Sequence, residues 1–144
     1  MSAPGTITTL AGDADAVLEA IHAAILADPD LAVDLGAPAR AHDTVPTRSS
    51  YPYLTYGTVR SEDRSADGLA RTAHRLSLHV WTRDGSRSEV LSLLSRAQRA
   101  VTTRVSHRVL PLYTDVFDLP ETRRAGATTR HGLLHLSIIT ETET

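Results

Sequence analysis

The sequence predicts an α+β fold, a two-layer sandwich in which a mostly antiparallel sheet carries two amphipathic helices on one face. Three observations lead to this fold class. The 144 residues suit one domain and leave no room for a second of ordinary size. Two segments repeat apolar residues at helical spacing, whereas the others alternate as strands do. The expected order is α-β-β-α-β-β-β, and its short links favour antiparallel neighbours.

The first helix is expected at residues 13–27, where the apolar residues recur every three or four positions. One face of this helix collects Val17, Leu18, Ile21, Ala24 and Ile25. Asp13 is expected to cap the N-terminus of the helix. The helix should end before Pro29, because proline disfavours helical geometry in the preceding residue. A short turn at residues 30–35, closed by Gly36, is expected next.

A long surface connection is expected at residues 37–50, which contain two prolines and no apolar periodicity. Residues 51–60 then alternate and predict a strand. Its two faces are expected to carry Tyr53, Thr55, Gly57 and Val59 on one side, and Leu54, Tyr56 and Thr58 on the other. Residues 61–70 are charged and contain the turn former Asp67-Gly68, so a long mobile loop is expected there.

The clearest strand is expected at residues 71–83, paired with the preceding strand as a hairpin. Alternation points Leu76, Leu78 and Val80 to one side, and Arg75, Ser77, His79 and Trp81 to the other. His74 and His79 are five residues apart and are therefore expected on opposite faces.

The second helix is expected to begin after Ser86, because Ser86 and Glu89 have the spacing of a capping box. The buried stripe of this helix is expected to consist of Val90, Leu93, Leu94, Ala97 and Val101. Three more strands are predicted at residues 108–113, 114–119 and 129–140.

The composition excludes several classes of chemistry. The chain has no cysteine, which rules out thiol catalysis, iron–sulfur clusters and thiolate zinc sites. A net charge of −2, from 17 acidic residues and 15 arginines, gives no overall attraction for nucleic acid or an anionic membrane. The sequence shows neither a signal peptide nor 18 consecutive apolar residues, so we expect a soluble protein. It contains no P-loop, dinucleotide glycine pattern, nucleophile elbow or H-E-x-x-H motif.

Seven histidines raise the possibility of metal binding or acid–base chemistry. His131 and His135 share one strand face but lie about 13 Å apart, too far to chelate one ion alone. His79 and His135 could meet if their strands pair, and Asp115 or Asp118 could join them. A small His-dependent enzyme is therefore one alternative function. A monomeric ligand-binding module, with loops framing a pocket, is another.

The strand face that carries Trp81 is the candidate functional surface. If the helices cover only one side of the sheet, Trp81 with Tyr53 or Tyr56 lies on the uncovered side; the alternative is a core position for Trp81. Aromatic residues and arginine are enriched at protein interfaces. The candidate interface with other protein subunits therefore consists of Tyr53, Tyr56, Trp81, Arg60, Arg64 and Arg75.

Several segments resemble a known family. Tyr51-Pro52-Tyr53-Leu54 followed by Gly57, a charged loop, the run HRLSLHVWT at residues 74–82 and an amphipathic helix look like the tail-completion or tail-terminator family. This family belongs to long-tailed, siphovirus-like bacteriophages and gene transfer agents. The first helix and the final run RHGLLHL at residues 130–136 also resemble the family. The resemblance covers nearly the whole chain in order, except residues 110–127.

The resemblance implies a single tail-terminator-like domain over residues 1–144, and we expect residues 1–12 and 141–144 to be flexible. It implies a non-enzymatic virion protein that caps the tail tube, stops tube polymerisation and joins the tail to the head-side connector. The implied partners are other copies of the chain in a hexameric ring, the tail tube protein and the connector or stopper protein. Genomic DNA would only pass through the lumen, with no membrane, cofactor or metal involved. The expected location is the virion tail, assembled in the host cytoplasm.

Overall fold

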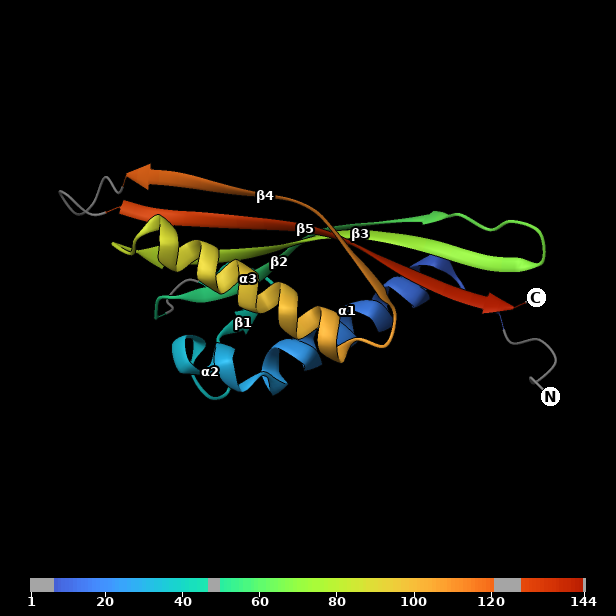
Figure 1. Ribbon diagram of the computed structural model, residues 1–144, viewed down its shortest axis with the longest axis horizontal. Coiled ribbons are helices and arrows are strands. Elements are labelled where there is room, and N and C mark those ends of the chain that lie inside the picture. The colour runs from blue at the N-terminus through green and yellow to red at the C-terminus, as the bar shows by residue number, and fades with distance from the viewer. Residues whose placement is uncertain (1–6, 47–49, 121–127, 144) are drawn as a thin grey trace.

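One sheet and a layer of helices make up the fold, as the computed structural model of residues 7–46, 50–120 and 128–143 shows (Figure 1). The sheet order is β1-β2-β3-β5-β4, antiparallel except for β1, which is parallel to β2. The helices are α1 (Leu10–Ala27), α2 (Pro29–Leu35) and α3 (Arg87–Arg104). The strands are β1 (Ala41–His42), β2 (Tyr53–Asp63), β3 (Leu69–Arg83), β4 (Arg108–Pro120) and β5 (Thr128–Glu143). The predicted α+β class is confirmed, with the helices on one side of the sheet.

The first two helices share a boundary at Asp28. Asp28 ends α1, and its carboxylate caps α2 by accepting hydrogen bonds from the N–H groups of Asp30 and Leu31. The predicted cap of α1 is wrong. Thr9 caps this helix, because its hydroxyl accepts a hydrogen bond from Gly12 at 3.0 Å, so α1 begins before Asp13.

The connection after α2 contains one element that the sequence does not signal. Ala41 and His42 form β1, which pairs in parallel with Leu54 and Thr55 of β2. A two-residue strand is too short to show alternation, so the prediction of an uninterrupted surface connection is wrong here. Residues 47–49 of that connection lie outside the described residues.

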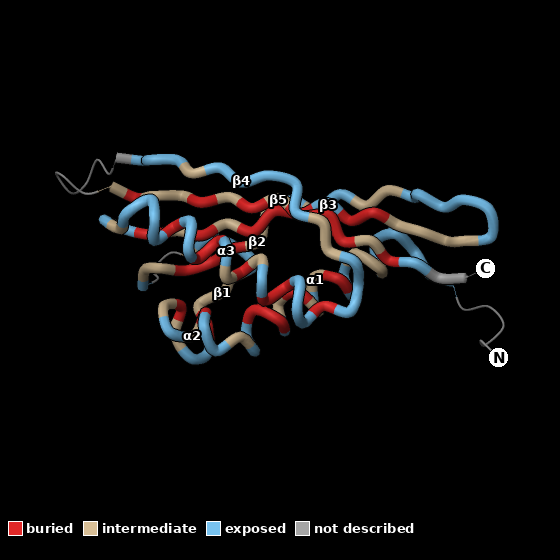
Figure 2. The backbone as a smooth tube through the Cα atoms, viewed as in Figure 1, coloured by how far each residue is buried: buried red, intermediate tan, exposed pale blue. Residues whose placement is uncertain are grey.

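The β2–β3 hairpin is longer than predicted. Asp63 pairs with Thr72, and Asp67 and Gly68 turn the chain with φ angles of 33° and 79°. Half of the expected loop, residues 61–63 and 69–70, is therefore strand. Its charged residues are compatible with strand pairing because this end of the sheet extends beyond the helices, where both faces meet solvent (Figures 1 and 2). A register shift after Tyr56 also moves Val59 to the helix-covered face, against the predicted alternation.

The second half of the chain follows the predicted pattern except within β4. Ser86 caps α3 by accepting a hydrogen bond from the N–H of Glu89 at 3.1 Å, and every residue of the predicted stripe is buried. The two strands expected at residues 108–119 are one strand, β4. A register shift between Pro111 and Tyr113 accommodates the proline without ending the strand.

The core lies between the helices and the sheet. On the sheet side it consists mainly of Leu54, Leu76, Leu78, Val80, Leu134, Leu136 and Ile138. Gly132 lets α3 approach closely, because a Cβ at Gly132 would lie 2.5 Å from Val90 Cγ1 and 3.0 Å from Leu94 Cδ1. This packing fixes which face of the sheet is covered.

Parts of the two ends of the chain that were expected to be flexible belong to regular elements, whereas residues 7–9 precede α1. Residues 10–12 lie in α1, and residues 141–143 lie in β5. Residues 1–6 and 144 lie outside the described residues, so the flexibility expected at both ends stays a prediction. None of the described helices has the length and apolar character needed to cross a membrane.

Candidate functional site

The candidate functional site is the sheet face that points away from the helices, here called the open face. On β3, odd-numbered positions from Arg75 to Arg83 lie on this face, opposite the core positions Leu76, Leu78 and Val80. Pairing continues the face onto β2, β5 and β4. The prediction that Trp81 lies on the uncovered side, rather than in the core, is confirmed.

One row of rings crosses four strands of the open face. Tyr53 of β2 is opposite Trp81 of β3, Trp81 is opposite His131 of β5, and His131 is opposite Phe117 of β4. The Trp81 and His131 rings stack with centroids 3.9 Å apart and planes 5° apart. The centroid distances are 6.2 Å for Tyr53–Trp81 and 5.8 Å for Phe117–His131. Such cross-strand aromatic pairs stabilise a sheet and create a rigid, largely apolar surface.

Beside this row, His79 forms hydrogen bonds through both ring nitrogens. His79 Nδ1 lies 2.6 Å from His131 Nε2, and His79 Nε2 lies 2.9 Å from Ser77 Oγ. A neutral imidazole has one N–H donor and one acceptor nitrogen, so His79 donates to one of these two partners and accepts from the other. Gly57 makes room for this arrangement, because a Cβ there would collide with Ser77 and His79.

The two histidines of this pair favour the neutral state. Burial, with smaller contributions from the charges of His131 and His135, lowers the pKa of His79 to about 4. Burial also lowers the pKa of His131. At neutral pH the centre of the open face is therefore uncharged, as the interior of a protein interface usually is.

The edge strand β4 is the most exposed part of this surface. Val109, Leu110 and Val116 are half-buried, and its other described side chains are exposed (Figure 2). The large apolar side chains among them are Leu112, Tyr113, Phe117 and Leu119, with exposed fractions of 43–52%. An exposed edge strand of this length and composition is a ready template for pairing with another chain.

The structure brings together only part of the predicted interface set. Tyr53 and Trp81 stack on the open face, and Arg60 is opposite Arg75 on the same face. Arg64 lies beside the β2–β3 turn, with Glu62 at 2.8 Å. Tyr56, the remaining member of the predicted interface set, does not lie on the open face.

Tyr56 lies on the helix-covered side of β2. Its hydroxyl lies 2.7 Å from His22 Nδ1 of α1, and its ring packs against the core. Burial raises the pKa of Tyr56, with a smaller contribution from Asp43. Tyr56 therefore connects α1 to β2 rather than adding to the open face.

The predicted meeting of His79 and His135 is replaced by a different pair. The register places His79 between Leu133 and Thr55, so its ring reaches His131, whereas His135 stacks on Tyr113 at 4.3 Å. Asp118 lies on the other side of the sheet, where it pairs with Arg87 and Arg130. Among the described residues, no group of three or more His, Asp or Glu side chains has the geometry to hold a metal ion.

A pocket does lie beside the predicted surface connection. Its volume is about 580 Å³, and it lies between α1 and the start of β2. The polar residues that line it are Asp15, Glu19, His22, His42, Asp43, Thr44 and Tyr56. The loop after α2 therefore borders a cavity, as the ligand-binding alternative expects.

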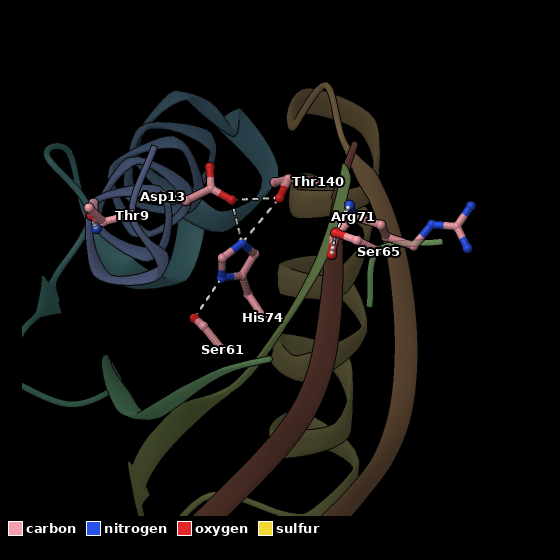
Figure 3. Close-up of polar contacts among 8 residues, drawn as sticks. Thr9, Asp13, Ser61, Ser65, Arg71, His74 and Thr140 are labelled. Atoms are coloured by element: carbon pink, nitrogen blue, oxygen red, sulfur yellow. Dashed lines mark hydrogen bonds and ion pairs between the residues drawn. The ribbon is translucent and has the colours of Figure 1, made fainter. Parts of the chain in front are cut away.

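A second histidine cluster, which the sequence does not reveal, lies on the covered side (Figure 3). The imidazole of His74 is fully buried, and its Nε2–H donates to the Asp13 carboxylate at 2.8 Å. Thr140 also donates to Asp13, at 2.6 Å, and the hydroxyl of Ser61 lies 2.7 Å from His74 Nδ1. Burial raises the pKa of Asp13, but hydrogen bonds from Thr140 and His74 outweigh it and hold the pKa below its usual value.

The order Ser61–His74–Asp13 resembles a hydrolase triad in composition only. A general base must exchange a proton with a substrate, and the His74 ring has no exposed surface through which to do so. The contacts instead connect α1, through Asp13, to β2, β3 and β5. This cluster is a structural connection between the two layers.

Comparisons with known proteins agree with this description. The sequence profile of the family described as Tail completion protein gp17 matches residues 19–141. No curated protein matches the chain. Among solved structures, a chain in the virion of a native gene transfer agent (GTA) particle is similar, with a TM-score of 0.53 and 19% identity. The match covers 84% of this chain and 92% of that chain, and at this identity it concerns the fold.

Proposed function

The chain belongs to the family of Tail completion protein gp17 and is a phage-type tail structural protein, and from this premise we propose that it terminates the tail. In this proposal, copies of the chain form a hexameric ring on the end of the tail tube. The ring stops polymerisation of the tube protein and presents its other side to the head-side connector. It is located in the virion tail and is assembled in the host cytoplasm. DNA passes through the lumen without being retained.

The open face, with β4 at its edge, is the observation that carries this proposal. The helices cover one side of the sheet, whereas the other side presents stacked rings and an exposed edge strand. A free edge with exposed apolar residues promotes association. We therefore assign this surface to contacts with other tail subunits.

The proposal includes no catalytic step. On the open face, both nitrogens of His79 form hydrogen bonds within the sheet, and the rings of His131 and His135 stack on Trp81 and Tyr113. These contacts hold the imidazoles in place as parts of a surface. The chain accordingly acts through its shape and its contacts.

Deleting the gene tests the proposed function. We expect unjoined heads and tails, with tails of irregular length, and rescue by the wild-type gene. Phe117→Asp should fail to rescue, because it places a charge within the apolar part of the open face. Val33→Asp is the matched control, since Val33 is 80% exposed on α2 and should rescue fully. Normal particles in the absence of the gene would refute the proposed role.

A further inference from the structure

The sheet ends in two edges that its own strands leave unpaired over several residues. On one side, β4 pairs only with β5 among the described strands. On the other side, β1 pairs only with Leu54 and Thr55, so residues 56–63 of β2 have no strand neighbour on that edge within the described part of the chain. Both edges are long enough to take a further strand, since strands of five or six residues are typical.

These two edges are complementary in direction. The strands β2, β3, β5 and β4 are each antiparallel to the next, so β2 and β4 run in opposite directions. Placing β4 of one copy beside β2 of the next therefore continues the antiparallel pattern. Repeating the same step is a heterologous contact, which closes into a ring when the rotation fits. A contact between two β4 strands would instead stop at two copies and leave both β2 edges free.

Side-chain chemistry selects a register for this pairing. The open faces of two copies become continuous only if open-face residues of β2 lie opposite open-face residues of β4. Placing Arg60 opposite Asp115 meets this condition and joins opposite charges. The same register places Val59 opposite Val116, and both of these side chains already pack against the core of their own copy.

We propose that the ring closes by antiparallel pairing of β4 of one copy with β2 of the next, in the register that places Arg60 opposite Asp115. This inference rests on the proposed function, because it identifies the contact within the proposed ring. The regular part of the pairing runs over residues 59–62 of β2 and 113–116 of β4, between the register shifts in the two strands. A ring built in this way covers the exposed edge of every copy.

Charge reversal tests the pairing without disturbing the core, since the Arg60 side chain is 76% exposed and Asp115 is also exposed. Arg60→Glu or Asp115→Arg alone should raise the protein concentration needed for ring formation about tenfold or more. The combination of Arg60→Glu with Asp115→Arg should restore it. Arg99→Glu is the matched control, because it makes the same charge change at an exposed arginine of α3, on the helix side of the sheet and away from the proposed contact. Native mass spectrometry measures the ring population.

Disulfide trapping tests the register directly, because the chain has no native cysteine. The proposed register places Glu62 opposite Tyr113, both on the open face, at a distance that suits a disulfide. The double variant Glu62→Cys/Tyr113→Cys should form covalent ladders of up to six copies under mild oxidation. Each single variant should remain uncrosslinked.

The outcomes separate the strand pairing from the ring itself. If wild-type protein forms rings but the double variant does not crosslink and the charge reversals have no effect, the pairing is wrong and the ring stands. If Tyr113→Cys alone forms dimers, β4 pairs with β4, and the inference is overturned. If the wild-type chain forms no ring either alone or on tail tubes, the proposed function fails, and this inference fails with it.

Discussion

The two faces of the sheet differ in how far the helices of the same chain bury their side chains. On the covered face, α1 and α3 pack over Leu76, Leu78 and Leu136, each of which is at most 1% exposed. On the open face, the rings of Trp81 and His131 remain half-buried although they stack on each other. The described helices therefore cover one face of the sheet only. In our account, the cover of the other face comes from neighbouring subunits.

Two histidines on β3, one on each face of the sheet, have different kinds of partner. His74 lies on the covered face and donates to a carboxylate, Asp13, from another element. His79 lies five residues later on the open face, and its partner is a second imidazole, His131. The first contact joins two layers of one chain, whereas the second organises a surface. Substitutions on the two faces should therefore affect stability and assembly to different extents.

The largest difference is expected between Leu78→Ala and Phe117→Ala. Leu78 is fully buried, so its truncation should lower the free energy of unfolding by about 3 kcal/mol. Phe117 is 46% exposed, so its truncation should cost less than about 1 kcal/mol in the free chain. Urea denaturation followed by circular dichroism measures both values. Equal losses would show that the two faces are equally part of the core of the free chain.

His74→Ala should have the next largest effect. It leaves the Asp13 carboxylate and Ser61 without their buried partner, so we expect a loss of about 2 kcal/mol. His135→Ala on the open face is the control and should cost less than about 1 kcal/mol. Thermal unfolding measures both variants. A His74→Ala protein as stable as the wild type would show that the cluster does not hold α1 to the sheet.

Acid should produce the smallest effect, and it should act through the open face. The pKa of His79 is lowered to about 4, so between its usual pKa and pH 4 the unfolded chain binds more protons than the folded chain. Stability should therefore fall as the pH drops from about 6.5 to 4, by on the order of 1 kcal/mol after allowance for solvent screening.

The control for this pH effect is His79→Gln, which keeps a side chain that forms hydrogen bonds but cannot titrate. Unfolding free energies measured at intervals from pH 7 to pH 4 should show a smaller slope for this variant. An unchanged slope would mean that other groups, such as the carboxylates, carry the acid sensitivity. The lowered pKa of Asp13 acts at more acidic pH, where its stabilising contribution is lost as the carboxylate protonates.

The sequence predicts well the elements whose signals are local. The capping box at Ser86 and the stripe of α3 depend on residues within a few turns, and the alternation in β3 assigns His74 and His79 to opposite faces. Prediction from the sequence fails where pairing between distant strands decides the length of a strand or the face on which a side chain lies. β4 continues through Pro111 because β5 pairs with both parts, and Val59 turns to the helices because β2 shifts register between Tyr56 and Val59.

The candidate site could be predicted only in outline. The uncovered face with Tyr53 and Trp81 follows from alternation and from the count of helices. The His79–His131 contact depends on the register between β3 and β5, for which the sequence has no local signal. The Asp13–His74 contact joins residues 61 positions apart, and Asp13 has a simpler interpretation as a helix cap.

Hydrogen–deuterium exchange of the free chain and of the same chain assembled on tails tests the central claim, that other subunits complete the open face. Amides of β4 that point away from β5 should exchange rapidly in the free chain and become strongly protected on assembly, while those of α1 and α3 change little. Protection that rises on the helices while β4 continues to exchange rapidly would contradict this account.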